Sequence, residues 1–269
     1  MTSRDPSRRP CLVFAALIFL CAGRAHAHGS FAGSFEPLVV APLLFALWLY
    51  VRSFVHLRSL QRVGLGLGMG ALFVALISPL GALGETLLSA HMVQHALLVA
   101  VAPPLLLLGH PAALFVRGLP LRWRPAWAGA ARVFSMLSRP LPAAALHGFT
   151  LWFWHAPAAF DAALESAPLH LVEHASFFGT ALLFWTAVMR MRGVHRSAAA
   201  LAAAFATLVH SGLLGALITL APYPLYRGAS LEEQQLAGLI MWVPMGVAYL
   251  AACLYLASRL VAGAGLRAP

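Results

Sequence analysis

The chain is dominated by successive apolar runs, each about as long as the roughly 20 residues that an α-helix needs to cross a bilayer. Seven such runs follow residue 36, and short segments that carry most of the charged residues separate them. Inside a bilayer every backbone amide and carbonyl must be bonded within the chain, so apolar runs of this length fold as helices. We therefore expect an all-α polytopic membrane protein, a bundle of seven transmembrane helices at about 37–54, 63–80, 87–108, 140–157, 170–189, 198–221 and 235–258.

The composition agrees with a membrane protein and excludes an ordinary soluble one. Of the 269 residues, 61% are hydrophobic and 10% are charged, and the mean hydropathy is +0.82. An average soluble domain has roughly 25% charged residues. The net charge of +10 does not indicate a nucleic-acid partner, because the arginines are spread over short loops instead of forming one solvated basic face. We expect the lipid bilayer as a partner and no nucleic acid.

Residues 1–27 have the pattern of a cleavable signal peptide. Three arginines form a basic start, residues 12–20 form an apolar segment too short to span a bilayer comfortably, and Ala25-His26-Ala27 is a typical cleavage site. Cleavage would leave a single seven-helix membrane domain at 28–269; the alternative is an uncleaved first helix. After cleavage, His28 would carry a free α-amine beside its imidazole, a chelating pair for Cu(II), or would simply be tolerated near the cleavage site.

The placement of arginine predicts the orientation in the membrane. The chain has no lysine, and every arginine after the signal except Arg227 lies in alternate loops or near the C-terminus. Arginine-rich loops stay in the cytoplasm, so we expect the mature N-terminus in the periplasm and the C-terminus in the cytoplasm, with the protein in a bacterial inner membrane. The acidic residues after the signal all fall at or near the opposite, periplasmic face: Glu36, Glu85, Asp161, Glu165, Glu173, Glu232 and Glu233.

Five histidines are predicted to lie on the periplasmic side of the bundle. His91 and His95 open the third span, His155 ends the fourth, and His170 and His174 open the fifth. Residues i and i+4 share one face of a helix, so each pair can offer two imidazoles to one ion. Ionisable residues inside a membrane span usually mark a site, and we expect these five as metal ligands. The alternative is that they only form hydrogen bonds between helices or with lipid headgroups.

The neighbouring donors bear on which metal such a site would bind. Only Cys253 remains after the signal, so the sequence predicts neither a disulfide nor a site with several thiolates. Imidazole with a thioether from Met92 or Met241 favours copper, whereas imidazole with the Glu173 carboxylate favours zinc. Both methionines are also ordinary packing residues of apolar helices. A periplasmic histidine site without thiolates leads us to expect copper.

Two further histidines, His147 and His210, fall near the middle of their spans. They can hydrogen-bond to each other, ligate haem b between helices, or belong to a conduit for copper or protons. The last two roles would make the protein a haem electron carrier or a copper permease. The segment from His170 to His174 also fits the HxxEH metalloprotease pattern, with Glu173 as general base, but that motif normally lies in a soluble fold.

Polar side chains also gather at the start of the seventh span. Glu233, Gln234 and Gln235 can bond the second nitrogen of a ligating imidazole, or can cap the helix in contact with solvent. Within the spans, Pro103-Pro104 and Pro244 should kink their helices and free backbone carbonyls, which neighbouring groups must then satisfy.

Four segments in this order resemble the CtaG family of membrane proteins, which is associated with the assembly of haem-copper cytochrome c oxidase. They are HMVQHALLVAVAPPLLLLGHP at 91–111, LWFWHAP at 151–157, HLVEHASFF at 170–178 and EEQQLAGLIMWVP at 232–244. The resemblance covers about 36–258. It implies seven helices and a role in maturing the oxidase, through delivery of copper to its CuB centre.

The resemblance also implies residue roles and partners. Matched by position, it carries over as candidate metal ligands His91, His95, His155, His170 and His174. The implied partners are the oxidase subunit that carries CuB and a periplasmic copper donor, and no turnover of a substrate is expected. Two positions depart from the family pattern. Glu233 stands where an aspartate is usual, which keeps the charge, and Met245 stands where a small residue often follows Trp-Val-Pro.

Overall fold

The computed structural model describes residues 37–53, 57–109, 124–190 and 194–265. The predicted signal peptide at 1–27 and His28 lie outside the described residues. Within these ranges every regular element is a helix and there is no strand. The all-α prediction is therefore confirmed for the described part of the chain.

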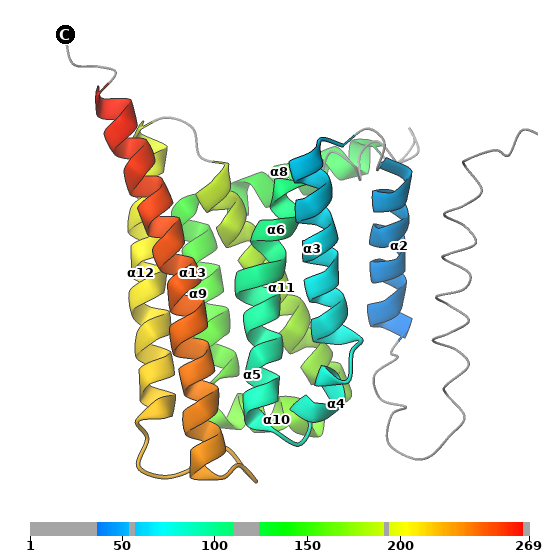
Figure 1. Cartoon of the computed structure of the whole chain (residues 1–269), viewed down its shortest axis with the longest axis vertical. Coiled ribbons are helices and arrows are strands. Elements are labelled where there is room, and N and C mark those ends of the chain that lie inside the picture. Colours follow the sequence, from blue (N-terminus) through cyan, green and yellow to red (C-terminus); the bar gives the residue numbers. More distant parts are fainter. Residues whose placement is uncertain (1–36, 54–56, 110–123, 191–193, 266–269) are drawn as a thin grey trace, which may run out of the picture.

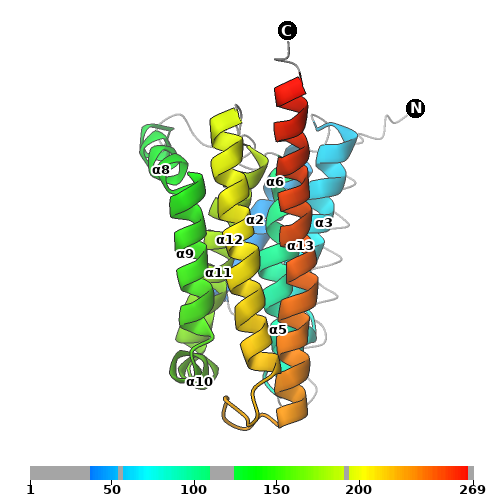
Figure 2. The same ribbon diagram turned by 90° about the vertical axis from the view of Figure 1, so that its left-hand side faces the viewer.

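The helices stand side by side as a bundle (Figure 1). The first half of the described chain contains α2 (Pro37–Ser53), α3 (Ser59–Leu76), α4 (Leu80–Gly84), α5 (Leu88–Ala96), the π-helical turn η4 (Leu97–Val101) and α6 (Ala102–Leu108). The second half contains α8 (Arg124–Leu137), α9 (Pro140–Trp154), α10 (Pro157–Glu165), α11 (Ala167–Met189), α12 (Val194–Thr219) and α13 (Leu231–Gly265). The short helices α4 and α10 and the segment 220–230 lie at one end of the bundle, which we call the α10 end; α8 lies at the other (Figures 1 and 2).

Helices occupy all seven places where the sequence predicts a span. Five segments are long and apolar enough to cross a membrane by length and composition: Ser59–Leu76, Leu88–Leu108, Ala167–Met189, His195–Thr219 and Leu231–Ala262. The first and fourth predicted spans fold as α2 and α9, with 17 and 15 residues. Both are shorter than the roughly 20 residues of a typical crossing helix. The described structure is thus that of an all-helical membrane protein with five helices of spanning length.

Three helices, α4, α8 and α10, lie in segments that the sequence analysis treated as loops. The boundaries of α10 follow from local chemistry. A residue before proline is driven to an extended conformation, and Ala156, which precedes Pro157, has φ −66° and ψ 130°. Ser166 is also extended, with φ −138° and ψ 107°, and separates α10 from α11. These two residues let α10 lie across the end of the bundle (Figure 2).

The third predicted span is broken in its middle by η4, and prolines explain the break. Pro103 has no amide hydrogen to donate to the carbonyl of Val99, four residues before it. The indole Nε1 of Trp185 on α11 donates to that carbonyl at 2.8 Å, and this bond is buried. The prediction that neighbouring groups satisfy a carbonyl freed by proline is confirmed here. The bond also fastens α11 to η4 in the middle of the bundle.

Helices α12 and α13 approach closely because glycines lie between them. A Cβ atom at Gly215 would lie 2.9 Å from the Cα of Trp242, and one at Gly238 would lie 2.7 Å from the backbone nitrogen of Thr219. Either contact is too short for a larger side chain. Helix α13 also packs against α5, and α9 packs against both α11 and α12. The helices that carry the predicted histidine pairs, α5 and α11, are thereby enclosed by the rest of the bundle.

Replacing Trp185 with phenylalanine should destabilise the fold, since the ring volume is largely kept while the Val99 carbonyl loses its donor. The expected loss is about 1–3 kcal/mol, the usual cost of a buried unsatisfied acceptor. Thermal unfolding of the purified protein in detergent would measure it. Trp152→Phe is the matched control, because this ring is 39% exposed on α9. Equal unfolding temperatures for the two variants would contradict the assignment.

Candidate metal centre

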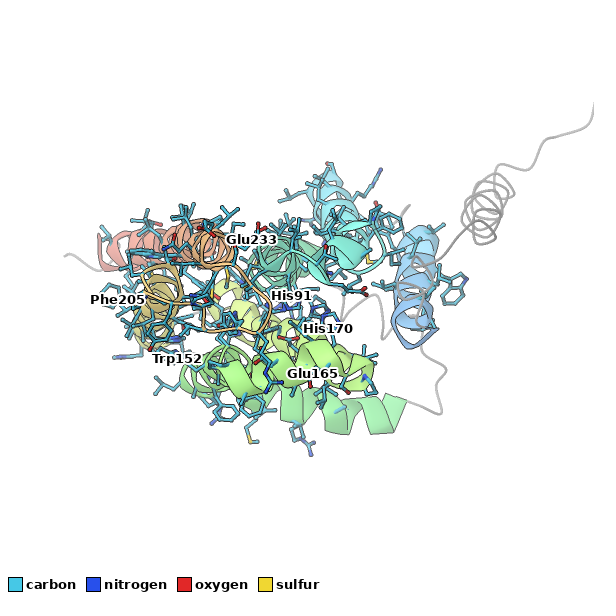
Figure 3. The ribbon with its side chains drawn as sticks, turned by 90° about the horizontal axis from the view of Figure 1, so that it is seen from below. His91, Trp152, Glu165, His170, Phe205 and Glu233 are labelled. Carbon is cyan, nitrogen blue, oxygen red and sulfur yellow. The ribbon has the colours of Figure 1, made fainter. Side chains whose placement is uncertain are left out.

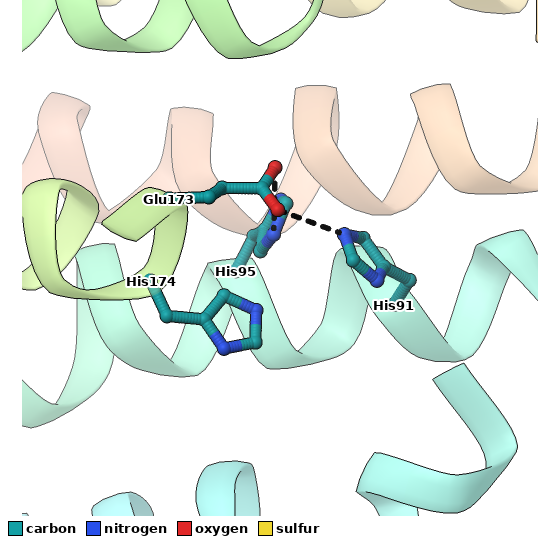
Figure 4. Close-up of side chains that lie close together, drawn as sticks. All are labelled: His91, His95, Glu173 and His174. Carbon is teal, nitrogen blue, oxygen red and sulfur yellow. Dashed lines mark ion pairs between the residues drawn. The ribbon is translucent and has the colours of Figure 1, made fainter. Parts of the chain in front are cut away.

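Two helices bring four donor side chains together near the α10 end. His91 and His95 lie one turn apart on α5, and Glu173 and His174 are neighbours on α11. One ligand atom from each of the four lies within 4.8 Å of the others, so the group could hold a metal ion. Figure 4 shows the Glu173 carboxylate between the two α5 imidazoles, with His174 opposite. We call these four residues the central group.

The distances around Glu173 suit ligands of one ion better than hydrogen-bonded partners. Its Oε1 lies 3.6 Å from Nε2 of His95, and its Oε2 lies 3.9 Å from Nε2 of His91. Both separations exceed the length of a normal hydrogen bond. Two atoms that each lie about 2.0–2.2 Å from one metal ion are separated by roughly 3–4 Å. Glu173 therefore has the spacing to His91 and to His95 that two ligands of one ion would have.

The central group is buried, and most of its polar atoms have no hydrogen-bond partner within the described residues. Glu173 is fully buried, and His91, His95 and His174 are at most 8% exposed. Within the described residues no hydrogen bond reaches either carboxylate oxygen of Glu173, either ring nitrogen of His95, or Nε2 of His91 and His174. Burying polar groups in this way costs free energy unless something compensates them. A bound cation would compensate all four side chains at once.

His155 lies beside the central group with one nitrogen already oriented. It follows α9 at the turn that Pro157 imposes, and its Nδ1 lies 2.7 Å from the Leu151 carbonyl, to which it donates. Its Nε2 is then left with a lone pair and has no hydrogen-bond partner within the described residues. Ligating histidines characteristically donate their other ring nitrogen to a carbonyl in this manner. The ring lies 5.8 Å from that of His95.

His170, in the first turn of α11, lies on the other side of the central group. Its ring centroid is 4.1 Å from that of His174 and 5.3 Å from that of His91. Unlike the other four predicted ligands it is only half-buried. Seen from the α10 end, it lies beside His91 near the middle of the bundle (Figure 3). The structure thus brings all five predicted histidines into one neighbourhood, four of them on α5 and α11.

Residues that the sequence analysis did not select cover this neighbourhood. Phe160 of α10 is fully buried, and its ring lies 5.2 Å from that of His91. The ring of Tyr226, from the segment 220–230, lies tilted against that of Phe160 with 4.3 Å between the ring centroids, and its hydroxyl donates to the His155 carbonyl at 3.0 Å. Burial raises the pKa of this tyrosine above its usual range, so the hydroxyl remains a donor. Aromatic rings therefore close the site.

An exposed ion pair joins α10 to the segment 220–230. Arg227 lies 3.0 Å from the Glu165 carboxylate and 3.6 Å from that of Asp161, and its backbone nitrogen donates to Asp161 at 3.2 Å. The sequence held a signal for this contact, because Arg227 is the one arginine on its predicted side of the membrane. Its acidic partners, 62 and 66 residues away, were identified only as members of an outer acidic set.

The polar start of α13 binds backbone groups, and its described hydrogen bonds include none to an imidazole. Glu233 accepts a hydrogen bond at 3.0 Å from the amide of Ser89 in the first turn of α5. The Gln234 amide donates to the Ile218 carbonyl at 3.2 Å and accepts from the amide of Leu225. Gln235 is exposed. Glu233 and Gln234 thus hold α5, α12 and the segment 220–230 in place, and the support of a ligating imidazole by Glu233, Gln234 and Gln235 stays a prediction.

Two methionines proposed as accessory ligands, Met92 and Met241, are buried within the large apolar core of the bundle. This is the packing role that the sequence analysis set beside ligation.

His147, deeper in the bundle, has a partner for each ring nitrogen. Its Nδ1 lies 3.2 Å from the hydroxyl of Thr180 and its Nε2 lies 2.8 Å from the hydroxyl of Tyr249. Thr180 gives its own hydrogen to the Ser176 carbonyl, so His147 donates from Nδ1 and accepts from Tyr249 at Nε2. Neither nitrogen is left for haem iron. The ring of His210 packs on α9, where a Cβ atom at Gly148 would lie 3.0 Å from its Nε2.

A model of a known protein family matches nearly all of the described chain. The model of the family described as cytochrome c oxidase caa3 assembly factor (Caa3_CtaG) matches residues 37–262. The chain belongs to this family. The match runs from the first residue of α2 into the last turns of α13, so it includes every helix that contributes to the candidate site. No curated protein and no solved structure matches the chain.

In this member of the caa3 assembly factor family, removing His147 should affect stability and leave the central group intact. His147→Leu deprives the Tyr249 and Thr180 hydroxyls of a partner and should destabilise the fold by about 1–3 kcal/mol. Thermal unfolding would detect that loss, and the amount of any metal ion retained after gel filtration should equal that of the unchanged protein. A lower metal content in His147→Leu would contradict the separation between the two histidine groups.

Proposed function

We propose that this protein is a membrane assembly factor that binds copper as cargo at its periplasmic face and aids its delivery to the CuB centre of cytochrome c oxidase. One observation carries the proposal: three imidazoles and a carboxylate, from His91, His95, His174 and Glu173, converge in a buried site where, within the described residues, no hydrogen bond reaches the carboxylate or any of the three Nε2 atoms. Membership of a cytochrome c oxidase assembly family supplies the setting in which such a site would act.

The charge of the central group, and not the type of its ligands, favours Cu(I) over zinc as the cargo. Imidazole binds both ions, so ligand type alone does not decide between them. Glu173 is the single carboxylate in the central group. In a buried site, a monovalent ion beside one ionised carboxylate leaves no net charge, whereas a divalent ion leaves one positive charge to be buried at a cost. Cu(I) is therefore the ion that we assign to the central group, with His155 as an additional ligand of the held ion and His170 as a ligand at the outer edge of the site.

The orientation follows from the arginines. The ends of α2, α11 and α13 and the starts of α3, α9 and α12, which adjoin the arginine-rich segments, lie together opposite the α10 end (Figure 1). By the positive-inside rule that end is cytoplasmic, so the α10 end and its histidines face the periplasm. We propose that α2 and α9 also cross the inner membrane, which gives seven spans after a cleaved signal peptide.

The partners that fit this proposal are the oxidase subunit that carries CuB and a periplasmic copper donor. The protein would hold copper between the two and would not turn over a substrate. Glu173 therefore acts as a ligand, in contact distance of two imidazoles, and not as the general base of an HxxEH protease.

Replacing His91 or His174 with alanine should lower the copper content of the purified protein and leave the host oxidase deficient in CuB. Each change removes one ligand of the central group and opens a cavity beside the others. Metal analysis of the purified variants and the CuB content of the oxidase from the same cells would measure the two effects. An absorption spectrum of the same samples separates copper from haem, and metal analysis separates copper from zinc.

His195→Ala is the matched control, because His195 is exposed and lies at the opposite end of the bundle from the central group. It should leave copper content and oxidase activity unchanged. Full oxidase activity in both His91→Ala and His174→Ala would refute the proposed function.

A further inference from the structure

The five clustered histidines differ in how far they are exposed: the one at the start of α11 is more exposed than the other four. His170 is half-buried, while His91, His95, His155 and His174 are at most 8% exposed. His170 also lies in the first turn of α11, directly after the extended Ser166 that separates this helix from α10. It is thus the imidazole of the cluster that lies nearest to the outside.

Ring contacts connect His170 to the rest of the cluster in steps. Its nearest imidazole neighbours are His174 at 4.1 Å and His91 at 5.3 Å. These two lie 5.3 Å and 4.3 Å from His95, which in turn lies 5.8 Å from His155. The Nε2 atom of His170 is buried, although the residue as a whole is half-buried. One side of the ring therefore faces the central group while another part of the residue reaches the surface.

A copper ion faces a barrier on its way to the central group, because the site is buried and Phe160 and Tyr226 cover it. An ion that gave up all its outside ligands before meeting new ones would pass through a poorly coordinated state in a medium of low polarity. Exchanging one ligand at a time avoids that state. This requires an imidazole that can bind the incoming ion while lying next to the ligands of the central group.

We infer that His170 is the loading ligand of the site: it takes copper from outside and passes it to His174 and His91 by stepwise ligand exchange. This inference rests on the proposed function, since it concerns the same site. It assigns to His170 a role in the rate of loading, distinct from the role of the central group in holding the ion. His170 is not one of the four residues whose ligand atoms lie within 4.8 Å of one another, which agrees with that division.

The test follows the transfer of Cu(I) from a coloured chelator to the full-length protein in detergent, without oxygen. His170→Gln should slow loading by about tenfold, the effect of raising one barrier by a single lost interaction. The final amount of bound copper should stay the same. His170→Met should restore fast loading, because a thioether also binds Cu(I). A purely structural role for His170 would not be rescued in this way.

Val172→Gln is the matched control, because Val172 lies in the same stretch of α11 and is 54% exposed. It should load at the rate of the unchanged protein. Loading at the normal rate in His170→Gln would overturn the inference, as would equal slowing in Val172→Gln. A fall in the final copper content of His170→Gln would also overturn it, since His170 would then be a holding ligand. If the unchanged protein takes up no copper, the proposed function itself fails.

Discussion

The burial of Glu173 between two imidazoles is the constraint on which the α10 end of this bundle depends. A carboxylate inside a membrane helix is unfavourable unless its charge is compensated, and here the nearest polar atoms are the Nε2 atoms of His91 and His95, at distances that suit a shared cation better than hydrogen bonds. These must come from a different helix, one turn apart, at the right depth. The spacing of the α5 histidines and the packing of α5 beside α11 are therefore parts of one arrangement, and neither helix could shift along the other without separating the donors.

The surrounding structure fixes α5 from several sides. The Gln94 amide, on the turn between the two histidines, donates to the Ala75 carbonyl on α3 at 2.8 Å. Glu233 of α13 accepts from the amide of Ser89 at the start of α5. Deeper in the bundle, Trp185 of α11 bonds the Val99 carbonyl that Pro103 leaves free. The break in the third span thus provides an attachment point that holds the third span and α11, which carry the central group, together in the middle of the bundle.

The sequence predicted α5 and α11, the helices of the histidine pairs, because their signals are local. Apolar runs gave the helices, the i and i+4 spacing gave the shared faces of His91 with His95 and of His170 with His174, and arginine placement gave their common depth. The contacts that close the site were not predictable in this way. Tyr226 bonds the carbonyl of His155 across 71 residues, and Glu233 bonds Ser89 across 144. Periodicity holds no information about such pairs. For the same reason the sequence suggested Gln234 as a support for an imidazole, while in the structure its amide binds the backbone of α12 and of the segment 220–230.

The two groups of histidines show why burial alone does not identify a metal ligand. His147 and His91 are equally buried, at 0% and 1% exposure. Each nitrogen of His147 meets a hydroxyl, and the hydrogen of Thr180 is itself used, so this network is complete without any ligand. The central group differs because its donors face one another: imidazole Nε2 atoms face carboxylate oxygens at distances too long for hydrogen bonds. A protein group that filled the space between them would have to come from a neighbouring helix, and Phe160 and Phe177 occupy the adjacent positions with apolar rings. Within the described residues these atoms have no hydrogen-bond partner, and a small cation fits their charge and spacing.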